Sequence, residues 1–268
     1  MLSNANNGSI KIGNTEMNYV SFGKGHKHFI ILPGLSDGLA TVRGKALYLS
    51  KPYKKFFDEY TVYMFSRKDK MEEGYSIYDM AHDQAIAIKE LGLDKVSVMG
   101  VSQGGMIALA LAIYHPELID KLVLTVTSAS VNEMIETNIN KWIRIAEEGE
   151  HKELMMDTAI KSYSDAYLKK YNKLLPLLGV LSKPKSYDRF LINAKAILKF
   201  NVVDDLDKID CPTLIIGGSE DKIVGIDASY LMHERIEGSE LYVYNSLGHA
   251  LYEEAKDYND RVLEFLER

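Results

Sequence analysis

The sequence predicts an α/β protein, with a mostly parallel sheet of about eight strands, helices on both faces and an inserted helical segment. Short apolar runs typical of buried strands alternate with helical patterns along most of the chain. The alternation stops between about 131 and 200, where only helical patterns remain. We therefore expect a core domain formed by residues 1–130 and 201–268, with residues 131–200 inserted as a helical cap.

The first half of the chain supplies most of the predicted strands. Residues 9–12 and 15–22 alternate polar and apolar side chains around Gly13-Asn14, which favours a hairpin. The continuous apolar run at 28–32 predicts a strand that is buried on both faces. Further patterns predict strands at 61–65, 95–99 and 121–126, and helices at 39–50, 78–91 and 105–112.

The alternation resumes after the insertion. Residues 213–216 and 241–244 are apolar or aromatic and predict two further strands. Helical patterns follow each of them, at about 225–236 and 252–267. Strands that alternate with helices in this way favour one parallel sheet covered on both faces.

A glycine-rich turn joins the strand at 95–99 to the helix at 105–112. Its sequence, Gly100-Val101-Ser102-Gln103-Gly104, fits G-x-S-x-G in the strand–turn–helix setting that a nucleophile elbow requires. Such a turn holds the serine in a strained conformation with its Oγ above the sheet, and the helix N-terminus favours nearby negative charge. Ser102 is therefore the candidate nucleophile, and a serine that only caps the helix is the plainer alternative.

A serine nucleophile needs a base and an acid that orients the base. His249 follows the strand at 241–244, and the carboxyl ends of parallel strands share one edge of a sheet, so His249 can meet Ser102. Asp221 follows the strand at 213–216 at the same edge, with its neighbour Glu220 as the alternative acid. The chain order serine, aspartate, histidine favours Asp221.

On these residues the chain resembles enzymes of the α/β-hydrolase fold over nearly its whole length. The matching segments are residues 32–35, 100–105, 217–221 and 248–249. The resemblance implies an esterase-like serine hydrolase with a helical cap. It also implies an oxyanion hole formed by the backbone N–H groups of Leu35 and Gln103.

Two loops depart from the family pattern. Pro33-Gly34 stands where the family commonly has His-Gly, although the backbone donor survives. Many members carry Asp-x-Arg-Gly-x-Gly after the fourth strand, whereas this chain has Ser66-Arg67-Lys68-Asp69-Lys70. The role of this second loop is left open by the sequence.

The predicted reaction is cleavage of an ester, thioester or similar acyl bond of a small to medium substrate through an acyl-enzyme. Fold and triad do not fix the leaving group, so a lyase, an acyltransferase or a C–C-bond hydrolase stays open, as does a low-turnover ligand-binding receptor. A lyase or a C–C-bond hydrolase would need additional polar residues in the cap. The candidates are Arg144, Lys161, Lys169 and Arg189. Ser102 argues against haloalkane dehalogenases and epoxide hydrolases, which use an aspartate at the elbow.

Four further residues are expected to contact the substrate. Met106 and Ala250 should lie near the serine from the core side. Tyr163 and Tyr167, four residues apart, should share one face of a cap helix and line the pocket.

Composition excludes several other classes of protein. The net charge is −6 and no basic block is present, so neither nucleic acid nor an anionic membrane is an expected partner. The N-terminus lacks a signal-peptide pattern and no apolar run is long enough to span a membrane, which favours a cytoplasmic protein. Cys211 is the single cysteine, and neither metal-ligand spacing nor G-x-G-x-x-G is present, so no metal or cofactor is expected. Monomer and homodimer both stay open.

Overall fold

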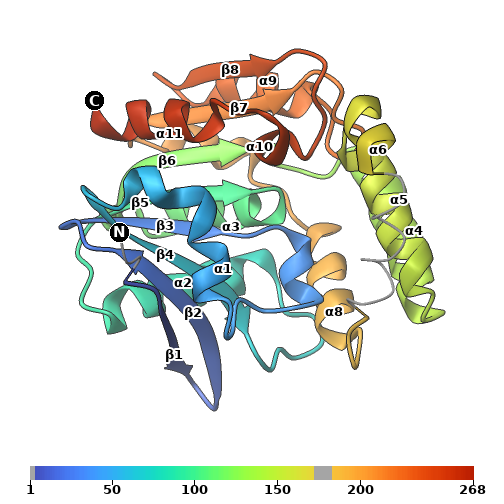
Figure 1. The fold of residues 1–268 in the computed structure, drawn as a ribbon, viewed down its shortest axis with the longest axis horizontal. Coiled ribbons are helices and arrows are strands. Elements are labelled where there is room, and N and C mark those ends of the chain that lie inside the picture. The colour runs from blue at the N-terminus through green and yellow to red at the C-terminus, as the bar shows by residue number, and fades with distance from the viewer. Residues whose placement is uncertain (1–3, 172–182) are drawn as a thin grey trace.

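The computed structural model describes residues 4–171 and 183–268, and this part of the chain forms one eight-stranded sheet (Figure 1). The strand order is β1-β2-β4-β3-β5-β6-β7-β8. β1 is antiparallel to β2 and β2 to β4, whereas all the other neighbours run parallel. The predicted fold class is confirmed. The strands are β1 (Asn6–Ile12), β2 (Thr15–Gly23), β3 (Lys27–Leu32), β4 (Tyr60–Lys68), β5 (Val96–Val101), β6 (Ile119–Thr125), β7 (Thr213–Gly218) and β8 (Glu240–Tyr244).

The central strands are buried on both faces, and their side chains divide between two apolar layers. All six residues of β5 are buried, as are all six of β7. Val96 and Val98 belong to one apolar cluster, whereas Met99 and Val101 belong to the other. This is the period of two that a strand imposes, and it explains why these strands are almost uninterrupted runs of apolar residues.

Helices cover both faces of the sheet (Figure 1). α2 (Ile77–Glu90), α3 (Gln103–Tyr114) and α9 (Asp227–Arg235) contribute buried side chains to the first layer. α1 (Ala46–Leu49), η2 (Lys51–Phe56) and α11 (Tyr258–Glu267) contribute to the second. α3 is the most deeply placed of these, because every one of its residues except Tyr114 is buried. Its central position fixes the turn that precedes it.

The helix predicted over 39–50 is wrong for most of its length. A short 3-10 helix, η1 (Leu35–Gly38), comes first, and α1 begins only at Ala46. Between them Gly44 has φ of +75°, a left-handed conformation that an α-helix does not accommodate. The apolar pattern in this segment therefore reflects a loop that packs on the sheet.

A helical insertion separates β6 from β7. Its described helices are α4 (Glu133–Glu147), α5 (His151–Ser162), α6 (Asp165–Tyr171) and α8 (Asp188–Ile197). An isolated bridge pairs Ser130 with Asn201, and Val202 N–H donates to Ala129 O at 2.8 Å, so the two ends of the insertion meet. α4 and α5 lie beyond the carboxyl end of β6 (Figure 1). The remaining described elements are η3 (Pro116–Leu118) before β6, η4 (Val203–Lys208) before β7 and α10 (Leu251–Glu254) after β8.

Candidate active site

Ser102 lies in a strained turn between β5 and α3. Its φ is +54° and its ψ is −121°, a region that residues other than glycine rarely adopt. Two hydrogen bonds to the end of β6 and the residues after it fix this turn. Ser102 N–H donates to Thr125 O at 2.9 Å, and the Thr127 hydroxyl donates to Ser102 O at 2.7 Å. A Cβ at Gly104 would stand 1.9 Å from Leu32 O, so only glycine permits this approach of α3 to β3. The local sequence therefore dictates the position of the half-buried serine at the cavity wall.

His249 and Asp221 are hydrogen-bonded to one another. His249 lies in the loop between β8 and α10, and its Nδ1 is 2.8 Å from Asp221 Oδ2. The other carboxylate oxygen accepts N–H groups from Ile223 at 2.8 Å and Val224 at 3.1 Å. A carboxylate can only accept, so Nδ1 carries the proton and Nε2 is left as the basic nitrogen.

The environment of Asp221 favours its charged form. Burial raises the pKa of this carboxyl group, but the His249 ring and the two backbone N–H groups outweigh burial, so the pKa of Asp221 lies below its ordinary value. Glu220, the alternative acid, has an exposed side chain. The geometry therefore pairs His249 with Asp221.

The two predicted oxyanion donors begin two helices at the same edge of the sheet. Leu35 is the first residue of η1 and Gln103 is the first residue of α3. The first N–H groups of a helix have no acceptor within that helix, so both can bind an incoming anion. Leu35, Gln103, Ser102 and His249 all line one cavity.

This cavity has a volume of about 130 Å³ and lies between the core and the insertion. Its polar wall is formed by the residues just named, and its remaining walls are mainly apolar. α4 contributes Ile135, Ile139 and Trp142, α5 contributes Thr158 and Ser162, α8 contributes Ile197, and the core contributes Gly34, Ser36, Met106, Ile223, Val224 and Tyr252. Met106 thus lies where the sequence places it, beside the serine.

Tyr163 and Tyr167 do not line this cavity, contrary to the prediction. α5 ends at Ser162 and Tyr163 is extended, so the two tyrosines do not share a helix. Their rings stack with centroids 4.3 Å apart, and the Tyr163 hydroxyl donates to Glu253 Oε2 at 2.8 Å. The hydrogen bond from Tyr163 to Glu253 thus connects the insertion to α10.

Ala250 also lies outside the cavity wall. It is buried, and its N–H donates to Ser162 O at 2.9 Å. This residue therefore joins the loop of His249 to the end of α5 and makes no part of the lining.

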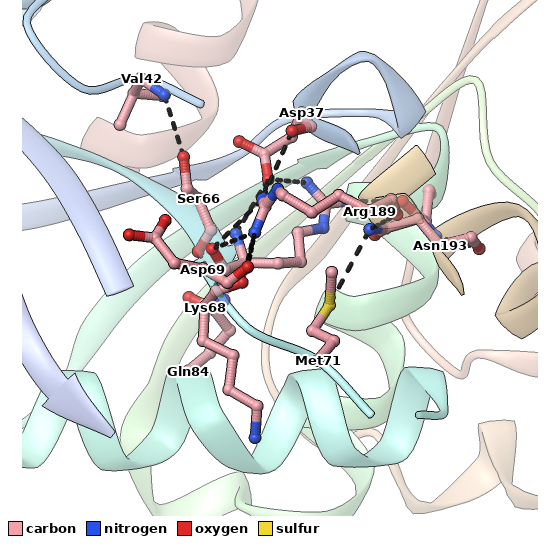
Figure 2. Close-up of polar contacts among 11 residues, drawn as sticks. Asp37, Val42, Ser66, Lys68, Asp69, Met71, Gln84, Arg189 and Asn193 are labelled. Atoms are coloured by element: carbon pink, nitrogen blue, oxygen red, sulfur yellow. Dashed lines mark hydrogen bonds and ion pairs between the residues drawn. The ribbon is translucent and has the colours of Figure 1, made fainter. Parts of the chain in front are cut away.

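A buried polar network, which the sequence does not predict, joins η1, the end of β4 and α8 (Figure 2). Arg67 and Asp37 are each 2% exposed, and Arg67 Nη2 donates to the side chain of Gln103 at 2.9 Å. Arg189, one of the candidate polar residues of the cap, donates to Asp37 Oδ2 at 3.0 Å. The one signal in the sequence is a charged residue at the end of an otherwise apolar strand, since such residues are seldom buried without a partner.

The described part of the chain offers no group of three or more His, Cys, Asp or Glu side chains that could hold a metal ion. Within residues 4–171 and 183–268, no helix has both the length and the apolar character needed to cross a membrane.

Comparison with known proteins relates the chain to hydrolases. A family model described as "alpha/beta hydrolase fold" matches residues 27–148. A 2-hydroxy-6-oxononadienedioate/2-hydroxy-6-oxononatrienedioate hydrolase of Klebsiella pneumoniae is 31% identical over 190 residues, 68% of this chain and 65% of that protein. The putative carbamate hydrolase RutD of a Caulobacter species is 27% identical over 208 residues, 73% of this chain and 74% of that protein. The chain thus spans slightly less than two thirds of the Klebsiella relative.

Solved structures agree on the fold. An alpha/beta hydrolase from a Medee basin deep-sea metagenome library superposes with a TM-score of 0.87 at 22% identity, covering 97% of this chain and 98% of that one. The enol-lactonase of Burkholderia xenovorans superposes with a TM-score of 0.81 at 18% identity, covering 97% and 100%. At these identities the likeness concerns the fold alone.

Proposed function

The chain belongs to the α/β-hydrolase-fold superfamily, and from that premise we propose that it is a serine hydrolase of acyl bonds. Ser102 is the nucleophile, His249 the general base and Asp221 the acid that orients it. One observation carries the proposal: His249, hydrogen-bonded to Asp221, lines the same cavity as a serine held at φ +54°. A charged aspartate, an imidazole protonated on Nδ1 and a hydroxyl at the cavity wall are the three components of this mechanism.

In the acylation step, Ser102 Oγ forms a bond to the carbonyl carbon of the ester and its proton passes to His249 Nε2. The carbonyl oxygen becomes an oxyanion, which accepts hydrogen bonds from the backbone N–H groups of Leu35 and Gln103. The bond between the carbonyl carbon and the leaving oxygen then breaks, and His249 returns the proton to that oxygen. The alcohol departs and the acyl group stays on Ser102.

Deacylation repeats the step with water. His249 Nε2 takes a proton from water while the water oxygen bonds to the acyl carbon. The bond to Ser102 Oγ breaks, the proton returns to Oγ, and the carboxylic acid is released.

The cavity favours a short acyl group. Its volume of about 130 Å³ is well below the 300–1,000 Å³ of typical ligand pockets. A larger groove of about 610 Å³ adjoins it, and both include Gly34, Ser36 and Tyr252 in their walls. We place the acyl group in the small cavity and the remainder of the substrate in the groove.

A hydrolase of a dicarboxylate, such as the Klebsiella relative's name describes, is the second candidate. A dianionic substrate calls for cationic side chains, and no lysine or arginine of the described chain lines the Ser102 cavity. Arg189 is bound to Asp37, and Lys161 is paired with Asp157 at 2.8 Å. Within the Ser102 cavity these contacts favour an uncharged acyl group, whereas the adjoining groove includes Lys51 in its wall.

Hydrolysis of p-nitrophenyl acetate and butyrate by wild type and by Ser102→Ala tests the proposal. We expect the substitution to lower kcat by at least about 10³-fold, because it removes the nucleophile. Ser186→Ala is the matched control, since Ser186 is exposed and lines neither the cavity nor the groove. Equal rates for wild type and Ser102→Ala would refute the proposal. A higher kcat/KM for 2-hydroxy-6-oxononadienedioate than for the esters would transfer the function to the second candidate.

A further inference from the structure

Gln103 is held by two elements that are distant in the sequence. Its side chain is completely buried, with Oε1 accepting from Arg67 Nη2 at 2.9 Å and Nε2 donating to Asn193 O at 2.8 Å. Arg67 lies near the end of β4, and Asn193 lies on α8 in the insertion. The backbone N–H of this same residue is the proposed oxyanion donor. The side chain thus connects the oxyanion hole to a cap helix.

The second oxyanion donor is fixed by the same group of residues. Asp37 lies two positions after Leu35 in η1, and its Oδ2 accepts the backbone N–H of Arg67 at 2.9 Å. The Arg67 guanidinium stands 3.8 Å from this carboxylate oxygen. Arg67 therefore contacts both elements that supply an oxyanion donor, η1 through Asp37 and α3 through Gln103.

The guanidinium keeps its charge in this buried position. Burial lowers the pKa of Arg67 to about 10, and Asp37 opposes that change. The group is therefore protonated near neutral pH. A charged donor makes a stronger and more directional bond to the Gln103 amide oxygen than a neutral one.

Arg189 connects α8 to this network through hydrogen bonds (Figure 2). The Arg189 guanidinium donates to Asp37 Oδ2 at 3.0 Å and to the main-chain oxygens of Lys68 and Asp69. The helix also packs closely on η1, because a Cβ on Gly38 would stand 2.8 Å from Phe190 Cα. A shift of α8 would therefore move the Asn193 carbonyl that Gln103 binds.

We propose that Arg67 and the side chain of Gln103 are positioning residues that set the oxyanion hole, and that α8 is part of the frame that holds them. The inference rests on the proposed function, since it assigns the two N–H groups to an oxyanion. Its consequence is that the position of the cap acts on the rate of the chemical step as well as on substrate binding.

Gln103→Met is the direct test. Methionine has nearly the length of glutamine and makes neither hydrogen bond, so the backbone donor remains but loses its support. With p-nitrophenyl acetate we expect kcat to fall by about 10- to 100-fold, while KM changes by less than about 3-fold. The rate of inactivation by a fluorophosphonate, in which a P–O bond to Ser102 forms and fluoride leaves, should fall by a similar factor. A merely structural role would lower the melting temperature without this split between kcat and KM.

Gln103→Glu tests the part played by α8. The carboxylate still accepts from Arg67 but cannot donate to Asn193 O. We expect kcat of Gln103→Glu to fall by a factor similar to that for Gln103→Met. Gln103→Glu also provides the test of the positioning role if Gln103→Met fails to fold. Wild-type kcat in Gln103→Glu would remove α8 from the proposal. Lys195→Ala is the control on the same helix, because its ion pair with Glu147 is half-exposed.

The failures of the two proposals are distinguishable. Wild type that neither hydrolyses the esters nor takes up the phosphonate on Ser102 would refute the serine-hydrolase function, and the positioning role with it. Active wild type together with unchanged kcat and inactivation rate in Gln103→Met would refute the positioning role alone.

Discussion

At the scale of single residues, the proposed reaction depends on how the two carboxylate oxygens of Asp221 are used. One oxygen orients His249 and the other accepts two backbone N–H groups, so the carboxylate is fixed on both sides. The sequence predicts the identity of this acid because the order of the three residues along the chain is informative. It could not predict how the carboxylate is held, since the N–H donors come from a turn with no distinguishing side chains.

Asp221→Asn should reduce kcat for p-nitrophenyl acetate by about 10³- to 10⁴-fold. An amide can donate to Nδ1 and so favour the wrong tautomer of His249, with Nε2 protonated. Glu220→Gln is the matched control, because it removes the neighbouring carboxylate, which is exposed. A similar loss of activity in both variants would contradict the assignment of the acid.

Asp221→Asn also gives a prediction for how the free energy of unfolding depends on pH. The pKa of Asp221 is lower in the folded protein than its ordinary value of about 3.9. Its contribution to the free energy of unfolding is therefore complete above roughly pH 5 and declines as the pH falls through the folded pKa. Urea denaturation should show the difference between wild type and Asp221→Asn shrinking from neutral to acidic pH. A difference that stays constant over this range would refute the linkage.

At the scale of elements, the sequence predicts those whose periodicity is decided by the sheet. β5, β7 and α3 are apolar almost throughout because they are buried on both faces or on all sides. The helix predicted at 39–50 is wrong because most of the apolar residues in this segment pack as a loop. The prediction for Tyr163 and Tyr167 fails for a related reason, since Tyr163 is extended after the end of α5 and only Tyr167 lies in α6.

Gly38→Ala should disturb the seating of α8. The new Cβ would meet backbone atoms of Phe190, which cannot move without the helix. We expect kcat to fall by about 10-fold, because small displacements of catalytic groups are costly. Gly44→Ala is the control: it has open space around it, and its φ of +75° makes it lose stability without moving α8. Steady-state kinetics and thermal melts on both variants separate the two effects, and equal kcat values would contradict the prediction.

Tyr252 is the largest of the side chains that line both the small cavity and the adjoining groove. Tyr252→Ala should join the two spaces and admit longer acyl chains. We expect the ratio of kcat/KM for p-nitrophenyl octanoate to that for the acetate to rise by at least about 10-fold. Tyr48→Ala, which changes the groove alone, should leave the ratio unchanged. An unaltered ratio in Tyr252→Ala would place the acyl group elsewhere.

At the scale of the whole molecule, the core and the insertion meet at the site. The insertion is closed at its base by Ser130 and Asn201, fastened to α10 by Tyr163, and joined to the oxyanion hole through α8. The sequence predicts the core, the insertion and the three triad residues from local patterns and chain order. The network of Arg67 could not be predicted, because its partners lie 30 and 36 residues away and no periodicity relates them.

The most direct test of the central claim is a crystal structure of the protein after reaction with a fluorophosphonate. The account predicts a phosphorus atom bonded to Ser102 Oγ, with His249 Nε2 beside it. One phosphonyl oxygen should lie about 2.7–3.1 Å from the backbone nitrogens of both Leu35 and Gln103. An adduct on any other residue, or a phosphonyl oxygen directed away from both nitrogens, would contradict the account.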